Sequence, residues 1–227
     1  SMGIGIIIPV MPALFAEVTG SAKISDIAVW GGLLASTFAL MQFIFGPILG
    51  ALSDKYGRKP ILLLALFIMA AYYLLMGFAQ TLWLLFLGRL IGGITAATHA
   101  TAKAYMADIS LPEEKAARFG MLGAGFGLGF VLGPLIGGLL GEWGSRTPFF
   151  VAAILAAANG VLCLFVLRES LETKNRREFM WHRANPIGAI LDLRKFDGIY
   201  PLLLVFLLFT IGTSIYAAIW PFFTVER

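Results

Sequence analysis

GALSDKYGRKP, residues 50–60, interrupts a very apolar part of the chain with one acid, three bases and two glycines. The runs on either side, residues 28–52 and 60–79, are long enough to cross the hydrocarbon of a bilayer, which takes about 20 helical residues. Charged side chains are costly inside that hydrocarbon. The stretch is therefore predicted to be a short loop between two membrane helices.

The composition of the whole chain indicates a membrane protein. Of the 227 residues, 59% are hydrophobic and 13% are charged, and the mean hydropathy of +0.87 lies outside the range of soluble domains. The apolar runs show no alternation with a period of two, so helices are expected. The predicted fold class is an all-α membrane protein with about seven spans, at residues 1–16, 28–52, 60–79, 82–107, 117–141, 147–167 and 200–222.

The positions of the basic residues predict the orientation, because lysine and arginine accumulate on the cytoplasmic side. One set of alternate connections holds only Lys23, Arg146 and the terminal Arg227. The other set is rich in bases, namely Lys55, Arg58, Lys59, Lys115, Arg118, Arg168, Lys174, Arg176, Arg177, Arg183, Arg194 and Lys195. Residues 50–60 are thus expected in the cytoplasm.

Several functional classes are excluded by what the sequence lacks. Cys163, the single cysteine, lies in an apolar run, so neither a disulfide framework nor a metal-ligand spacing is present. No nucleophile, metal cluster or phosphate-binding loop has the spacing that an enzyme needs. The net charge of +4 is explained by bases at helix ends, which argues against a nucleic-acid partner. We expect no enzymatic activity, no cofactor and no metal.

The long polar segment divides the chain into three parts. Residues 1–167 are predicted to form a six-helix bundle, residues 168–199 a cytoplasmic linker, and residues 200–227 a seventh helix. Within the linker, residues 186–196 are predicted to form a short amphipathic helix on the membrane surface.

The first motif is Gly-x3-Asp-x2-Gly-Arg-Lys, made by Gly50, Asp54, Gly57, Arg58 and Lys59. Gly57 can take the positive φ that a tight turn requires. The pattern resembles the signature of the major facilitator superfamily between its second and third helices. A positive-inside loop with a turn glycine is the simpler alternative.

The second motif is a glycine stripe in the fifth predicted span. Its members, four residues apart on one face, let another helix approach closely, and they are Gly125, Gly129, Gly133, Gly137 and Gly141. Pro134 is expected to bend the helix. Gly133-Pro134-x-x-Gly137-Gly138 resembles the motif of the antiporter branch of the superfamily.

The fourth predicted span carries ionisable residues inside the membrane. Arg89 resembles the superfamily's helix-four arginine, which is associated with proton coupling; the alternative is an arginine that snorkels to the outer surface. In a continuous helix Arg89, His99 and Lys103 fall within an arc of about 80°. His99 titrates near neutral pH and is a candidate proton carrier, or else a hydrogen-bonding partner of a neighbouring helix.

The resemblance covers the whole chain and favours the tetracycline and multidrug/proton antiporter branch. It implies twelve helices in two halves, of which this chain is the first half plus helix seven, incomplete at both ends. The implied activity is proton-driven efflux of a small amphipathic compound across the inner membrane by alternating access, with the bilayer, protons, the substrate and the missing half as partners. Candidate cavity residues are Thr95, Thr98, Thr210, Ser214 and Tyr216.

The resemblance also assigns a gate. Arg58 is expected to reach Asp108, and Asp54 a helix end of the second half. Two departures bear on coupling and substrate: the acid that the branch carries in helix one falls upstream of Ser1, and the Asp-Tyr of many tetracycline exporters reads Tyr72-Tyr73 here. A nutrient facilitator or symporter on the same fold is the alternative function. A seven-helix receptor is a remote alternative, because helix seven lacks a retinal-binding lysine and the loops lack cysteines.

Overall fold

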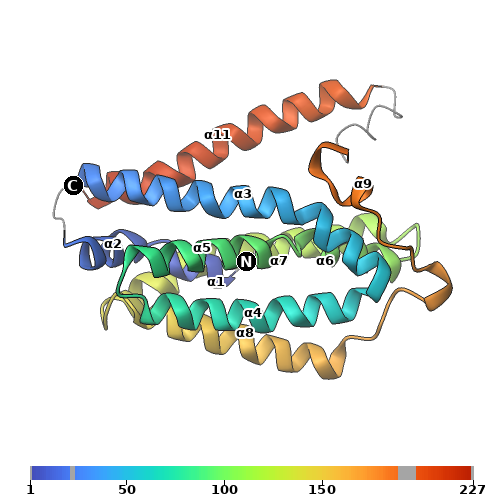
Figure 1. Ribbon diagram of the computed structural model, residues 1–227, viewed down its shortest axis with the longest axis horizontal. Coiled ribbons are helices and arrows are strands. Elements are labelled where there is room, and N and C mark those ends of the chain that lie inside the picture. The colour runs from blue at the N-terminus through green and yellow to red at the C-terminus, as the bar shows by residue number, and fades with distance from the viewer. Residues whose placement is uncertain (1, 21–23, 189–197, 226–227) are drawn as a thin grey trace.

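The chain folds into a bundle of long helices, as expected for an all-α membrane protein (Figure 1). The computed structural model describes residues 2–20, 24–188 and 198–225, and the side chains of residues 2–20, 29–182, 184–188 and 198–213. The elements are α1 Met2–Ile7, α2 Met11–Thr19, α3 Ile24–Tyr56, α4 Arg58–Phe78, α5 Leu82–Ala96, α6 His99–Asp108, α7 Lys115–Gly141, α8 Thr147–Val166, the 3₁₀ turn η1 Thr173–Asn175, α9 Trp181–Ala184 and α11 Ile199–Val225.

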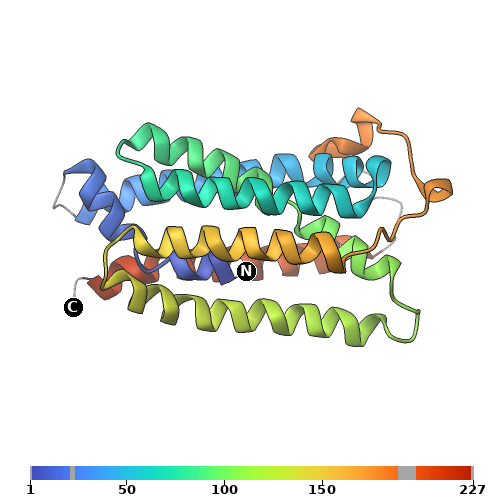
Figure 2. The same cartoon turned by 90° about the horizontal axis from the view of Figure 1, so that it is seen from below.

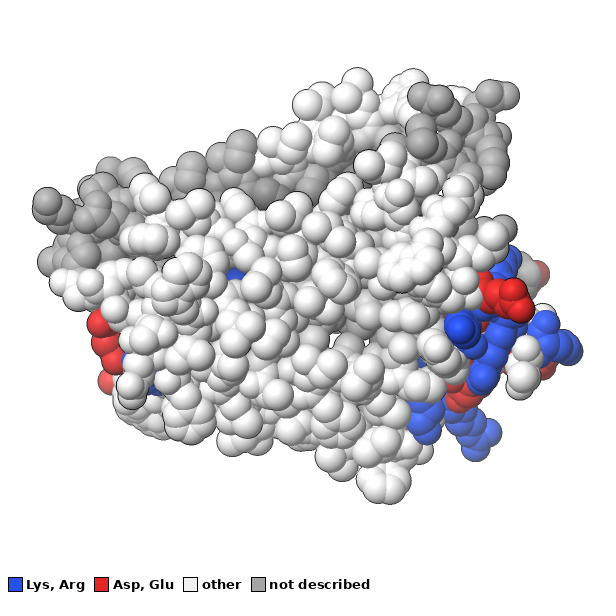
Figure 3. Space-filling model, viewed as in Figure 1, with Lys and Arg blue, Asp and Glu red and all other residues white. Residues whose placement is uncertain are grey.

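Among the described residues, five helical segments are long and apolar enough to cross a membrane, and they end at Tyr56, Phe78, Asp108, Gly141 and Val166. They match five of the predicted spans. The seventh span corresponds to α11, whose segment Ile199–Thr213 is apolar. On the face shown in Figure 3, charged residues gather at the two ends of the bundle and leave the middle almost free of them, as a bilayer requires.

The first predicted span is not one helix. α1 and α2 are separated by a turn at residues 8–10 that contains Pro9, and Pro12 occupies the first turn of α2. Proline lacks the N–H that a helix interior needs but fits a helix start, which explains the break. α2 ends at Gly20, whose φ of 64° and N–H bond to the Ala16 carbonyl close the helix.

The fourth predicted span is present as one membrane-length segment, Leu82–Asp108, but a turn at residues 97–98 interrupts its helix. α5 ends at Ala96 and α6 begins at His99. Neither glycine nor proline stands at the break, but two threonines bond back to the helix: Thr95 Oγ1 to the Gly92 carbonyl at 2.9 Å and Thr98 Oγ1 to the Thr95 carbonyl at 2.6 Å. Such back-bonding bends helices.

The core lies where α1, α2, α4, α5 and α8 meet. Its largest fully buried side chains include Phe15, Tyr73, Met76, Leu85 and Phe149. α4 and α8 run side by side, and α7 lies on one flank of the bundle against α1 (Figure 2). Most of α7 is exposed, because its contact with the bundle is restricted to one face.

The linker leaves α8 at Val166 and returns along the end of α3, where α9 packs. The amphipathic helix predicted at residues 186–196 falls mostly outside the described residues, so it stays a prediction. α11 crosses α3 obliquely (Figure 1).

Candidate functional site

The stretch at residues 50–60 is almost entirely helical, which the expectation of a loop missed. α3 continues through Asp54 to Tyr56 and α4 starts at Arg58, so Gly57 alone makes the connection. Its φ of 107° is one that side-chain-bearing residues rarely adopt. The helical register places Asp54 and Arg58 four residues apart across the turn.

Arg58 joins two acids at the cytoplasmic end. Its Nη1 lies 2.5 Å from Asp54 Oδ1 and its Nε lies 3.1 Å from Asp108 Oδ2, at the end of α6. Ser53 Oγ accepts a further bond from Arg58 Nη1 at 2.7 Å. The Arg58 side chain is only 11% exposed, so this pairing is shielded from water. The expected contact between Arg58 and Asp108 is therefore present.

Asp54 also faces open space. It lines a cleft of about 510 Å³ together with Gly46, Gly50, Ala100 and Met180. A methyl group added at Gly46 or Gly50 would meet nothing within 4 Å. The α3 side of the cleft is thus open at these glycines, while Ala100 of α6 and Met180 of the linker line its other sides. The Arg177 N–H bonds the Asp54 carbonyl at 3.0 Å and ties the linker to this face.

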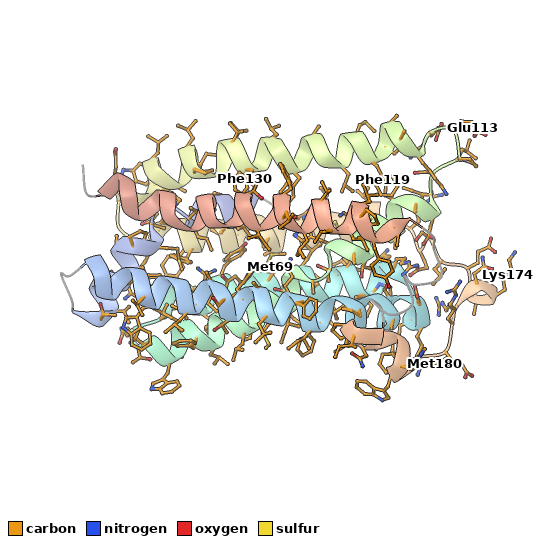
Figure 4. The ribbon with its side chains drawn as sticks, turned by 90° about the horizontal axis from the view of Figure 1, so that it is seen from above. Met69, Glu113, Phe119, Phe130, Lys174 and Met180 are labelled. Atoms are coloured by element: carbon orange, nitrogen blue, oxygen red, sulfur yellow. The ribbon has the colours of Figure 1, made fainter. Side chains whose placement is uncertain are left out.

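The residues that follow α8 also bind the turn between α3 and α4, and the sequence analysis did not predict this contact. Glu169 accepts hydrogen bonds from the N–H groups of Arg58 and Lys59, and Ser170 Oγ donates to Asp108 Oδ2 at 3.2 Å. In Figure 4, Lys174 and Met180 of the linker and Glu113 of the α6–α7 connection lie at this same end of the bundle. The sequence offered one signal for this contact: Gly57 precedes a helix but has no side-chain oxygen to cap it, so a cap from another residue is expected.

The glycine stripe forms a close contact with α1, but not along its whole predicted length. A methyl group at Gly133 would lie 2.6 Å from the Gly5 Cα, and one at Gly137 would meet the Ile6 carbonyl. Gly129 is buried at the same interface, where its carbonyl lies against Gly5, and Gly141 faces Val10. A methyl group at Gly125 or Gly138 would meet nothing within 4 Å, so these two glycines take no part in the contact with α1. α7 is continuous through Pro134.

Arg89 lies in the interior among aromatic rings. Its guanidinium sits 5.8 Å from the Phe38 ring centroid, and its charge acts on the buried hydroxyls of Tyr72 and Tyr73. The Arg89 Nε and the Tyr72 hydroxyl are buried without a hydrogen-bond partner among the described atoms. Arg89 therefore points inward, against the snorkelling alternative.

His99 is separated from Arg89 by the break between α5 and α6. Its ring meets the edge of Phe126 on α7, at 5.9 Å between centroids, whereas Arg89 faces α3 and α4. The shared face predicted for Arg89 and His99 stays a prediction, because contacts with different neighbouring helices are compatible with an arc of about 80° between them.

Three of the five predicted cavity residues have described side chains, and their role stays a prediction. Thr95 is buried and Thr98 half-buried, and both hydroxyls bond to their own helix. Thr210 is exposed on α11 and bonds the Phe206 carbonyl. The side chains of Ser214 and Tyr216 lie outside the described residues. No group of three metal-binding side chains occurs among the residues that the structure describes.

The opposite end of the bundle carries a second charged cluster that the sequence did not reveal. Arg146 donates to the carbonyls of Gly77 and Ala79, at 3.0 and 2.8 Å, and pairs with Glu17 at 3.0 Å. The Ser145 hydroxyl donates to Glu17 at 2.6 Å. The hydrogen bond from Ser145, followed by that from Arg146, lowers the pKa of Glu17 below its ordinary value of 4.5. This cluster joins α2, α4 and α8.

A sequence model of the Major Facilitator Superfamily matches residues 1–227. The chain belongs to the Major Facilitator Superfamily. This family of transporters agrees with the cytoplasmic Asp54–Arg58–Asp108 cluster and the membrane-length helices, and the chain is a multi-pass protein of the cytoplasmic membrane.

Within the superfamily, the chain is similar to drug-resistance proteins. The chain is 39% identical over 227 residues to tetracycline resistance protein class C of Escherichia coli, covering 100% of this chain and 56% of the relative. It is 31% identical over 231 residues to multidrug resistance protein 2 of Bacillus subtilis (strain 168), covering 98% and 55%. The crystal structure of the human organic anion transporter MFSD10 (TETRAN) is similar with a TM-score of 0.66 at 27% identity, covering 77% of this chain and 46% of that one. The chain spans about half the length of the curated relatives it matches.

Proposed function

We propose that this chain forms the first bundle and helix seven of a transporter that exports a small amphipathic drug across the cytoplasmic membrane, driven by protons. The observation that carries the proposal is the identity of 39% with a tetracycline resistance protein along the entire chain, together with 31% to a multidrug resistance protein. Its partners are then the bilayer, the substrate, protons and the second half of the transporter.

The cluster of Asp54, Arg58 and Asp108 acts in this proposal as a cytoplasmic gate. Arg58 is held by two acids within one bundle, and Asp54 also borders the open cleft on α3. A helix end of the second half that docks in this cleft would meet the Asp54 carboxylate, which favours the positive end of a helix dipole. The contact would form when the cytoplasmic side closes and would stabilise the outward-facing state.

Proton coupling is assigned to Arg89 and His99, of which Arg89 is half-buried and His99 is exposed. The Arg89 Nε and the Tyr72 hydroxyl are both buried without a hydrogen-bond partner among the described atoms, so a nearby acid that changes its charge would act strongly on Arg89. Among the described side chains of the five membrane-length helices, the acids Asp54 and Asp108 lie near the cytoplasmic ends. The proton-carrying acid is therefore expected elsewhere in the transporter.

The proposed substrate class is a small amphipathic compound and is not restricted to tetracycline. Tyr72 stands at the position where, by the resemblance, many tetracycline exporters carry an aspartate. Its ring is buried against Gly92. A phenol carries no charge at neutral pH and cannot pair with a metal-bound or cationic drug as a carboxylate does. We therefore expect a substrate range that extends beyond tetracycline.

The proposal is tested with the intact transporter in a drug-sensitive bacterial strain and in inverted membrane vesicles. Expression should raise resistance to tetracycline or to cationic dyes, and addition of the drug should release protons from energised vesicles. A protonophore should abolish both effects. Wild-type transporter that leaves drug accumulation and vesicle pH unchanged, or that accumulates a nutrient instead, overturns the proposal in favour of a facilitator or symporter.

A further inference from the structure

The start of α4 depends on a partner from a distant part of the chain. The first N–H groups of a helix have no partner within it, and Gly57 has no side chain to supply one. Here the Glu169 carboxylate accepts hydrogen bonds from the Arg58 N–H at 2.8 Å and from the Lys59 N–H at 3.2 Å. The capping acid thus comes from 110 residues further along the chain.

The two helix ends cap each other. Lys59 Nζ donates to the Leu164 carbonyl at 3.0 Å, in the last turn of α8, while Glu169 caps the first turn of α4. An anion at a helix N-terminus and a cation at a C-terminus are both favoured by the helix dipoles. Glu169 is itself oriented by the Leu171 N–H at 3.0 Å. The carboxylate is therefore fixed from both sides.

The space around Gly57 is fitted to this carboxylate. A methyl group at Gly57 would collide with Glu169 Oε2 and would lie 2.8 Å from its Cδ. Glycine therefore allows the close approach of Glu169, and its φ of 107° is a conformation that other residues rarely adopt. The neighbouring Ser170 holds Asp108, the acid that Arg58 reaches.

We propose that Glu169 is a positioning residue of the gate. It acts through the main chain: Arg58 is the first residue of α4, so fixing its N–H fixes the origin of the side chain that spans Asp54 and Asp108. The gate then extends from the α3–α4 turn to the first residues of the linker that leads to helix seven. This inference rests on the proposed gate but not on the identity of the drug.

The test measures gate opening without any substrate. In the intact transporter, with Cys163 and any other cysteine replaced by serine, single cysteines are introduced by Ala51→Cys beside the gate or Gln80→Cys at the opposite end. Glu169→Gln should raise maleimide labelling at residue 51 relative to residue 80 by about tenfold, the change that loss of a charge-assisted hydrogen bond produces. Glu169→Asp, which keeps the charge, should bring the labelling ratio part of the way back to the wild-type value.

Glu172→Gln is the matched control, because Glu172 is exposed and pairs with the exposed Lys174 at 2.7 Å. It should leave the labelling ratio at the wild-type value. The proposal is overturned if Glu169→Gln and Glu172→Gln behave alike, or if Glu169→Gln lowers the yield of folded protein without shifting the ratio. Because no drug is present, wild-type protein that exports nothing would refute the proposed function and leave this result standing.

A double substitution isolates the contact itself. Gly57→Ala should lower the thermal unfolding midpoint less in a Glu169→Ala background than in the wild type, because the collision with the carboxylate is then removed while the strained φ remains. Equal losses in both backgrounds would contradict the packing of Glu169 against Gly57.

Discussion

Arg58 and Asp108 are joined by a 3.1 Å ion pair although they are 50 residues apart, Arg58 at the start of α4 and Asp108 at the end of α6. The pair connects the α3–α4 turn to the end of α6, and Asp54 completes it from α3. Because Arg58 is nearly buried, removing either acid leaves a guanidinium with unmet hydrogen bonds. The cytoplasmic ends of three membrane segments therefore behave as one unit.

The first prediction concerns the two acids. Asp54→Asn is expected to abolish transport without preventing membrane insertion, because the open side of Asp54 is lost as a charged docking point. Asp108→Asn is expected to reduce transport about 10- to 150-fold, the equivalent of one charge-assisted hydrogen bond of roughly 1.5–3 kcal/mol, while Arg58 keeps Asp54. Drug efflux rates at matched protein amounts measure both.

Glu114→Gln serves as the control for these acids. Glu114 lies at the same cytoplasmic end, but it pairs within one exposed turn with Arg118 at 2.9 Å. Such pairs contribute about 0–1 kcal/mol, so efflux should stay at the wild-type rate. Normal efflux by Asp54→Asn would refute the gate.

The second prediction compares neighbouring glycines of α7. Gly137→Ala drives a methyl group into the Ile6 carbonyl and should destabilise the α1–α7 contact by about 1–3 kcal/mol, as overpacking does. Gly138→Ala meets nothing within 4 Å and should be neutral or stabilising, by up to about 1 kcal/mol, through helix propensity. Thermal unfolding in detergent separates the two, and equal midpoints would contradict the close approach.

Hydropathy was sufficient to predict the five membrane-length helices, because the bilayer restricts them strongly, whereas the orientation inferred from the basic residues stays a prediction. Hydropathy could not predict the break between α5 and α6. Threonine occurs in many unbroken membrane helices, so the back-bonding of Thr95 and Thr98 leaves no distinct sequence signal.

The gate was only partly predictable. The spacing of Asp54 and Arg58 is local, so the motif indicated it directly. Glu169 is one of several acids in a polar linker, and its role depends on α8 returning beside the start of α4. The same limit applies to Arg146, whose acceptors on α4 are backbone carbonyls and have no side-chain identity.

The third prediction is a pH effect at the end opposite the gate. The pKa of Glu17 is lowered in the folded protein, so its contribution to stability is fully present above about pH 4.5 and is lost as the pH falls through the folded pKa. The carboxylate is 49% exposed, which limits that contribution to about 1 kcal/mol or less. Glu17→Gln should therefore lower the unfolding midpoint slightly at pH 7 and not at pH 3. A difference that grows toward low pH would contradict the assignment.

The last prediction concerns the buried phenol beside Arg89. The Tyr72 hydroxyl has no hydrogen-bond partner among the described atoms, so its burial costs free energy without return. Tyr72→Phe keeps the ring against Gly92 and should leave the unfolding midpoint unchanged or raise it, by up to about 1–3 kcal/mol of relieved desolvation. Tyr72→Ala, which empties the same space, should destabilise by about 3–5 kcal/mol and is the control for packing. A clear loss of stability in Tyr72→Phe would show instead that the hydroxyl bonds to Arg89 through a water or an acid of the second half, and would place Tyr72 within the coupling site.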